Sequence, residues 1–260
     1  MDILVNWENH ITTGVVDHVH VFQYCDTCWA FGLTRQMNAI FRLALLISGI
    51  ESLSVVHFIQ SMRRMLLLSH TLTISGLPTA VPFLTVNGLI LVGDFNSMCD
   101  RRTGLPLLSA PRFPSFVVSE MKIHRLREYK NHHEFEAAFF LALNYSPVAA
   151  VIPCYPSLDA FRSQQYVPHD YGLYSPPLQE LVSLYTKSHL IFATGRGRML
   201  DIPFVRFRDS AHGAFLNVRM GWGIITEFVQ LIGPRVKEEE KMLEKQGEDE
   251  FGEGLKAKNR

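Results

Sequence analysis

Two cysteines three positions apart, Cys25 and Cys28, are the residues best placed to do chemistry. The pattern predicts that they lie where a strand, His18 to Tyr24, turns into a helix that runs to Ile47. At such a turn, backbone N–H groups and the helix dipole stabilise a thiolate, which is the basis of dithiol redox chemistry. Asp26 opposes this, because its negative charge raises the pKa of a neighbouring thiol. We therefore interpret both cysteines as packing residues with no catalytic role, and keep thiol redox chemistry as an alternative.

Two further groups of residues could bind a metal or a phosphate. His132 and Glu136 have the i, i+4 spacing of ligands on one helix face, but no cluster of Cys, His or Asp accompanies them, so no metal site is predicted. The stretch from Gly195 to Arg198 lacks a preceding strand and the spacing of a phosphate-binding loop. We predict a flexible basic loop there.

The most informative pattern for the fold lies between Leu77 and Met98. Two apolar runs flank Asn87-Gly88, which predicts two short strands joined by a tight turn. Pro82 would open the first strand, because proline cannot donate to a strand ladder. Asp94 would cap the helix that follows. We take Pro82, Asn87, Gly88 and Asp94 as structural residues of a thioredoxin-like sheet.

The remaining elements of the first half complete this sheet. Val55 to Ile59 is expected to form the second strand, and Ser61 to His70 a connecting helix. The predicted order over residues 18–102 is therefore β-α-β-α-β-β-α.

The second half carries apolar residues at helical spacing. Helices are predicted from Ser115 to Tyr145, from Leu178 to Ala193 and from Trp222 to about Gly247. The predicted fold class is thus α/β plus all-α, a thioredoxin-like domain followed by a helical domain. The expected division is an N-terminal extension (1–17), the thioredoxin-like domain (18–102), a proline-rich linker (103–114), the helical domain (115–247) and a charged tail (248–260).

Bulk composition excludes several classes of protein. The chain has 260 residues, 47% of them hydrophobic, so it can bury a substantial core. Lysine plus arginine equals aspartate plus glutamate at 25 each, and no basic stripe is present, so nucleic-acid binding is not expected. Four cysteines do not make a disulfide framework. The apolar runs are interrupted by charges or prolines, so no transmembrane helix is predicted.

Three segments resemble the metaxin family, and its metaxin-2 branch in particular. They are the half from Val19 to Arg102, the stretch Tyr171-Gly-Leu-Tyr-Ser-Pro-Pro-Leu178, and Met220-Gly-Trp-Gly223. Val118-Ser-Glu-Met-Lys122 also resembles part of that family's first C-terminal helix. The resemblance implies a glutathione-transferase-like fold with a helical C-terminal domain and a cis bond before Pro82. Asp94 stands where transferases carry a hydroxyl donor and would repel the γ-glutamyl carboxylate, so no glutathione binding is expected.

The same resemblance implies a function. Metaxins are non-catalytic and mitochondrial, and they bind the machine that assembles β-barrels at the outer membrane. The chain is therefore expected to be a scaffold subunit for protein import, without cofactor, bound to protein subunits and in peripheral contact with the membrane. One alternative is an accessory subunit of an inner-membrane respiratory or ATP-synthase complex. The other is a thiol or glutathione-type redox enzyme that uses Cys25 and Cys28.

A partner interface is expected near the end of the chain. The family's final helices have no counterpart here, which would leave apolar surface uncovered. The predicted helix from Trp222 places more apolar residues together than one stripe requires. The expected interface residues are Ile224, Phe228, Leu231 and Ile232.

Overall fold

The computed structural model describes residues 1–9, 14–16, 26–98, 113–164, 172–182, 187–209 and 215–238. The helices are α1 (Cys28–Leu43), α2 (Val55–Arg64), the 3₁₀ helix η1 (Leu77–Ala80), the π-helical turn η2 (Phe83–Asn87), α3 (Val92–Ser97), the 3₁₀ turn η3 (Leu126–Glu128), α4 (His132–Tyr145), α5 (Pro156–Arg162) and α6 (Leu178–Leu181). The strands are β1 (Asp2–Asn6), β2 (Ser115–Arg125), β3 (Val148–Pro153), β4 (Ser188–Met199), β5 (Ile202–Arg208), β6 (Phe215–Arg219) and β7 (Glu227–Lys237).

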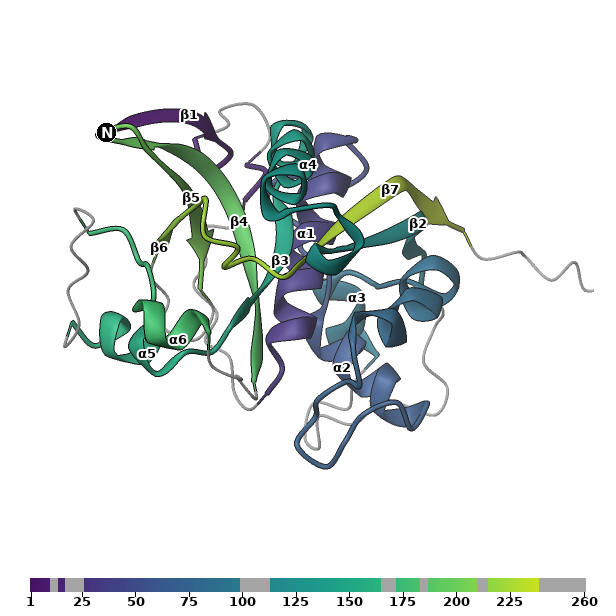
Figure 1. Cartoon of the computed structure of the whole chain (residues 1–260). Coiled ribbons are helices and arrows are strands. Elements are labelled where there is room, and N and C mark those ends of the chain that lie inside the picture. The colour runs from purple at the N-terminus through teal and green to yellow at the C-terminus, as the bar shows by residue number, and fades with distance from the viewer. Residues whose placement is uncertain are drawn as a thin grey trace, which may run out of the picture.

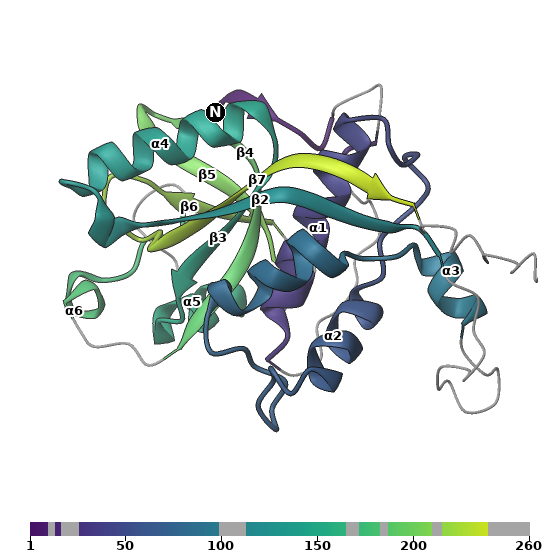
Figure 2. The same ribbon diagram turned by 90° about the vertical axis from the view of Figure 1, so that its right-hand side faces the viewer.

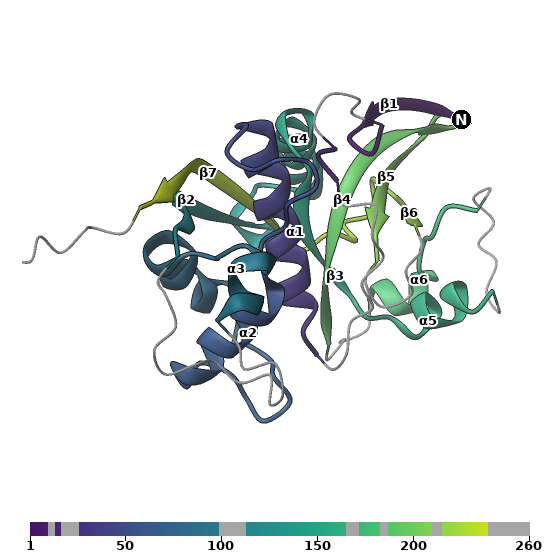
Figure 3. The ribbon, with the colours of Figure 1, turned by 180° about the vertical axis from the view of Figure 1, so that it is seen from behind.

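These strands form one seven-stranded antiparallel sheet in the order β2-β7-β3-β4-β5-β6, with β1 paired to β4. Figure 1 shows α1 at the centre of the molecule, with β3 to β6 on one side of it and α2 and α3 on the other. The view from behind shows the same two sides, with α5 and α6 at one end of the sheet (Figure 3). The molecule is thus a helical side and a sheet side that meet along α1.

The sheet is covered by α1 on one face and by α4 on the other, as Figure 2 shows. Alternation along β3 explains this, because successive side chains of a strand point to opposite faces. Ala149 and Val151 belong to the apolar cluster around α1, whereas Val148 and Ala150 belong to the cluster around α4. Every residue of β3 is buried. This strand is therefore the shared wall of two cores.

Helix α1 lies close against the sheet. A Cβ atom added at Gly32 would lie 2.8 Å from Leu190 Cδ2, so the absence of a side chain lets the helix approach the strand with Leu190 in its present position. Four residues further on, the buried Gln36 donates from Nε2 to the Val229 carbonyl at 2.8 Å and accepts from the Ala149 N–H at 3.2 Å through Oε1. A buried amide satisfied at both ends fixes the helix position along the strands.

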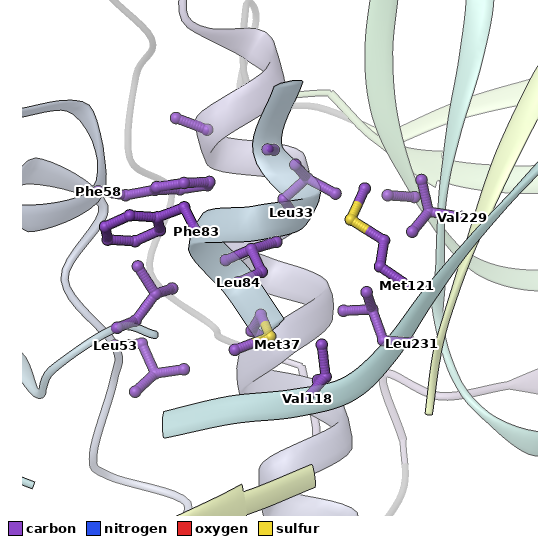
Figure 4. Close-up of a cluster of buried hydrophobic side chains, with 14 of the residues drawn as sticks. Leu33, Met37, Leu53, Phe58, Phe83, Leu84, Val118, Met121, Val229 and Leu231 are labelled. Carbon is purple, nitrogen blue, oxygen red and sulfur yellow. The ribbon is translucent and has the colours of Figure 1, made fainter. Parts of the chain in front are cut away.

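The helical side is built on the other face of α1. Phe58 of α2 stacks on Phe83 of η2 with ring centroids 5.2 Å apart, next to Leu33 and Met37 of α1 (Figure 4). Ser54 starts α2 by accepting the His57 N–H, as an N-cap residue does. The same cluster continues into β2 and β7 through Val118, Met121, Val229 and Leu231 (Figure 4).

The thioredoxin-like sheet predicted for the first half is wrong. Pro82 precedes the π-helical turn, and Asn87-Gly88 ends that turn instead of joining two strands. Gly88 has a φ of 75°. An Asn-Gly pair is suited to the end of a helical turn as well as to a hairpin turn, because both residues tolerate positive φ. Asp94 lies inside the first turn of α3, whose N-cap is Leu91. No cis peptide bond occurs among the described residues, Pro82 included.

Four other elements were predicted with the wrong type. Residues 55–59 begin α2, not a strand. Residues 115–125 and 227–237 are the paired strands β2 and β7, where helices were expected. The helix expected over 178–193 is only α6, and β4 follows. Short apolar runs do not by themselves distinguish helix from strand, and here the sheet partner decides.

The glycine-rich stretch from Gly195 to Arg198 is not a loop. It lies within β4, where added Cβ atoms at Gly195 and Gly197 would meet the backbone oxygens of Val5 and Asp2. The glycines therefore allow β1 to pair closely with β4.

The predicted division into an extension, two domains, a linker and a tail stays a prediction. The strand expected over 18–24, the linker up to residue 112 and the tail beyond 238 lie outside the described residues. Within the described part of the chain, no helix is both long and apolar enough to cross a bilayer.

Candidate active site

Cys28 is the first residue of α1, at the point where the helix meets the sheet. Its side chain is partly exposed and not in a disulfide. The N–H of Ala30 donates to the Thr27 carbonyl at 3.0 Å, so the first turn is already formed at this cysteine. No acidic residue lies in that turn. The positive end of the helix dipole therefore acts on the sulfur without an opposing charge from its own turn.

His189 is the histidine that faces Cys28. It is the second residue of β4 and is 6% exposed. Its Nε2 lies 3.0 Å from Oδ1 of the buried Asp209, which directly follows β5. Because Nε2 is used by this carboxylate, Nδ1 is the ring nitrogen left for the hydrogen bond between His189 and Cys28. Strands β4 and β5 are antiparallel neighbours, with Phe192 opposite Arg208, and this pairing brings Asp209 to His189.

The two partners shift each other's pKa in opposite directions. Burial alone would raise the pKa of the Cys28 thiol, but the hydrogen bond and positive charge of His189, with backbone N–H groups, lower it below its usual value. Burial alone would lower the pKa of His189, but its hydrogen bonds to Asp209 and Cys28 and their negative charges raise it to about 9. The two shifts therefore favour a thiolate–imidazolium pair over a neutral thiol and imidazole.

Asp209 is held from its far side by an arginine. Arg162, the last residue of α5, places Nη2 2.5 Å from Asp209 Oδ2 and Nη1 3.0 Å from Asp159 Oδ1. The side chains of Arg162 and Asp209 are 9% and 3% exposed. The Arg162–Asp209 contact is a close ion pair without the alignment of a linear hydrogen bond.

Cys28 and His189 line a cleft of about 910 Å³ between the helical side and the sheet side. The helical side contributes Trp29 and the segment from Thr73 to Leu77. The sheet side contributes residues within or directly next to β2, β3, β4 and β7: Arg125, Leu126, Arg127, Val151, Cys154, Lys187, Ser188, Leu190, Thr226 and Glu227. A cleft of this size can hold several residues of an extended peptide. Among the described residues, no group of three or more His, Cys, Asp or Glu could hold a metal ion.

Of the residues weighed for chemistry from the sequence, the structure places Cys28, which was interpreted as a packing residue, and Asp26 in the lining of this cleft. Cys25 lies outside the described residues. His132 and Glu136 do share α4, but both Glu136 oxygens accept the Gly221 N–H at 3.0 Å. Pro82, Asn87, Gly88 and Asp94 belong to η2, its end and α3 on the helical side.

The residues expected at a partner interface fill the chain's own interior. Ile224 and Phe228 are 2% and 1% exposed in the cluster beneath α4, and Leu231 is buried in the cluster around α1. Ile232 is partly buried in β7. The helix on which that prediction depended is a strand, which buries these side chains on both faces of the sheet.

No protein-family model matches the chain, and no curated protein matches it in sequence. Solved structures do match it. The cysteine protease Amb a 11, a ragweed pollen allergen in its proform, superposes with a TM-score of 0.62 at 15% identity, over 90% of this chain and 66% of that one. A cysteine protease from Carica candamarcensis gives 0.60 at 18% identity, over 89% and 98%. Bromelain from Ananas comosus gives 0.59 at 14% identity, over 88% and 98%.

This likeness shows that the chain has the fold of papain-like cysteine proteases. The metaxin resemblance and the glutathione-transferase-like fold are therefore wrong. The expectations of a non-enzymatic scaffold, of a respiratory or ATP-synthase subunit and of a redox enzyme are contradicted with them, because they rested on that fold. The mitochondrial location, the protein partners and the membrane contact were drawn from the same resemblance, and they stay untested predictions.

Sequence reasoning missed His189, Asp209 and Arg162, although one local signal was present. Cys25-Asp-Thr-Cys28-Trp29 keeps two cysteines and the aromatic residue of the Cys-Gly-Ser-Cys-Trp signature of papain-type nucleophiles, with Asp and Thr in place of Gly and Ser. Papain-like proteases orient their histidine with asparagine. Here an aspartate does so.

Proposed function

We propose that this protein is a cysteine peptidase in which Cys28 is the nucleophile and His189 the general acid and base. The observation that carries the proposal is that Cys28 and His189 line one cleft and act on each other, while the buried Asp209 holds His189 Nε2 at 3.0 Å from behind. Nucleophile, base and orienting group in mutual contact form the arrangement that acyl transfer requires. The fold of the cysteine proteases cited above supports the same conclusion.

Acylation starts from the thiolate–imidazolium pair. The Cys28 sulfur attacks the carbonyl carbon of a peptide bond, and a C–S bond forms while the carbonyl oxygen gains negative charge. Backbone N–H groups of the first turn of α1 lie where they can stabilise that oxygen. His189 then gives its proton to the leaving nitrogen, the C–N bond breaks, and a thioester remains on Cys28.

Deacylation uses the neutral His189 as a base. It takes a proton from water, the hydroxide forms a C–O bond with the acyl carbon, and the C–S bond breaks. The products are the new carboxylic acid and the restored thiolate–imidazolium pair. Asp209 holds the imidazole ring by its Nε2–H, so that Nδ1 stays directed at the sulfur in both half-reactions.

The test is hydrolysis of a library of internally quenched fluorescent peptides by the purified protein under reducing conditions. We expect hydrolysis that one equivalent of iodoacetamide abolishes, with the label on Cys28 by mass spectrometry. Cys28→Ala should lose at least about 10³-fold in kcat/KM, because the nucleophile is absent.

A matched pair of histidine variants separates chemistry from folding. His189→Gln should remove hydrolysis, whereas His133→Gln, which changes an exposed histidine on α4, should not. Hydrolysis that survives in Cys28→Ala, or a folded wild-type protein that cleaves no peptide of the library at any pH from 4 to 9, would overturn the proposal.

A further inference from the structure

The side chains that contact one another at this site continue beyond Asp209. Arg162 extends these contacts from α5, an element that contributes no residue to the cleft lining. Its guanidinium bridges two carboxylates, Asp209 in the interior and Asp159 near the surface, through Nη2 and Nη1. Four side chains from four parts of the chain thus form one continuous series, Cys28, His189, Asp209 and Arg162.

We propose that Arg162 is a positioning residue of this site, which keeps Asp209 ionised and turned toward His189. The inference rests on the proposed function where it uses the reaction cycle of His189, but its test does not require peptide hydrolysis.

The physical need for such a residue follows from the aspartate. A carboxylate whose side chain is 3% exposed has lost its hydration and becomes protonated unless partners replace the water. His189 supplies a positive charge only while it is protonated, and the proposed reaction makes it neutral once in every cycle. Arginine stays charged at every physiological pH, so Arg162 balances Asp209 throughout the cycle.

The geometry also explains why the residue is arginine. One oxygen of Asp209 accepts a hydrogen bond from His189 and the other contacts Arg162. Because both oxygens have a partner, rotation of the carboxylate is restricted. The second arm of the guanidinium is fixed to Asp159 on the same helix turn. A lysine has one nitrogen and cannot hold both carboxylates in this planar arrangement.

Other groups that act on His189 are few and do not replace Arg162. The Cys28 thiol faces it from α1, and Asp209 faces it from the end of β5. Cys154 follows β3, and Lys187 precedes β4; both line the same cleft. Among these groups and Arg162, only Arg162 is a buried cation in contact with Asp209.

The test measures titration of the site directly, because a merely structural arginine would not change it. The rate of Cys28 alkylation by iodoacetamide is recorded against pH, and the His189 ring is titrated by NMR. In Arg162→Met we expect the His189 midpoint to fall by about 0.5 unit or more, because Asp209 becomes protonated and no longer stabilises the imidazolium, and the Cys28 midpoint to rise by a similar amount, because a neutral His189 no longer stabilises the thiolate. Arg162→Lys keeps the charge and should return both midpoints most of the way to wild type.

A compensating variant guards against misfolding. Arg162→Met combined with Asp209→Asn removes both charges and leaves an amide to orient His189, so it should react faster with iodoacetamide and melt higher than Arg162→Met alone. Arg198→Gln, which changes an exposed arginine on β4, should leave both midpoints in place.

The outcomes for this inference and for the peptidase proposal differ. Unchanged midpoints in folded Arg162→Met would overturn the role of Arg162, whether or not the wild type cleaves peptides. Shifted midpoints with no cleavage by the wild type would support the role of Arg162 and contradict the peptidase.

Discussion

The two walls of the cleft provide their reactive groups in different ways. On the helical wall, Cys28 stands at the start of α1, where contiguous backbone supplies the positive end of a dipole. On the sheet wall, His189 of β4 lines the cleft; behind it Asp209, at the end of β5, holds His189, and Arg162 of α5 holds Asp209. The nucleophile therefore depends on local structure, and the base depends on contacts between distant segments. Removal of a buried charge behind the sheet wall should therefore cost more stability than removal of the sulfur, whose main effect should be on chemistry.

The largest expected difference between the walls is in stability. Asp209→Ala takes from His189 and Arg162 the buried carboxylate that both contact, leaving Arg162 only Asp159, and the loss of one member of a buried ion pair typically costs about 3–5 kcal/mol. Cys28→Ala removes one partly exposed sulfur and should cost about 1 kcal/mol or less. Urea unfolding of both variants at pH 7 measures the difference. Equal losses in the free energy of unfolding would show that Asp209 contributes no more to stability than Cys28 does.

An intermediate effect is expected where the walls meet. Gly32→Ala places a Cβ 2.8 Å from Leu190 Cδ2, so either the Leu190 side chain or α1 must shift at the strand that carries His189. We expect a loss of about 1–3 kcal/mol, as for other overpacked core positions. Gly93→Ala is the matched control, because nothing lies within 4 Å of its added Cβ. If Gly32→Ala costs as much stability in a Leu190→Ala background as in the wild type, the contact is not the cause.

The smallest expected effect is a change in how stability depends on pH. Between about pH 6.5 and 9, the unfolded chain has a protonated Cys28 and a neutral His189, while in the folded chain the pKa of His189 is raised to about 9 and the pKa of Cys28 is lowered, which favours imidazolium and thiolate. Each state then binds one proton at this pair, so the pair contributes no slope in the part of this window where the thiolate is formed.

In Cys28→Ser, the folded and unfolded states no longer bind the same number of protons at this pair. The folded state still binds a proton at His189, whose pKa Asp209 keeps raised, but the unfolded state binds none there. The stability of this variant should therefore fall as pH rises above 6.5, by at most about 1.4 kcal/mol per unit, while that of the wild type does not. Urea titrations at pH 6, 7, 8 and 9 provide the comparison. Parallel curves would contradict the thiolate–imidazolium pair.

Local sequence determined several features of this protein correctly. The helix that starts next to Cys28 was predicted from periodicity and is observed as α1, and residues 132–145 are helical as expected. These elements depend on contiguous residues, since helix hydrogen bonds join residues four apart. Even the dipole beside Cys28 is a local property, and the Cys-Trp signature there was visible in the chain.

Tertiary structure decided the rest. Residues 227–237 form a strand because β2 and β3 lie on either side to accept them, although the run is apolar enough for a helix. The positive φ of Gly88 suits the end of a helical turn as well as a hairpin turn. Packing of this segment against β2 selects the helical turn. His189, Asp209 and Arg162 carry no spacing that marks them, since the register of β4 and β5 and the end of α5 bring them together. The sequence by itself determined where a reactive thiol could stand, and only the fold decided which residues make it reactive, because charges act through space and not along the chain.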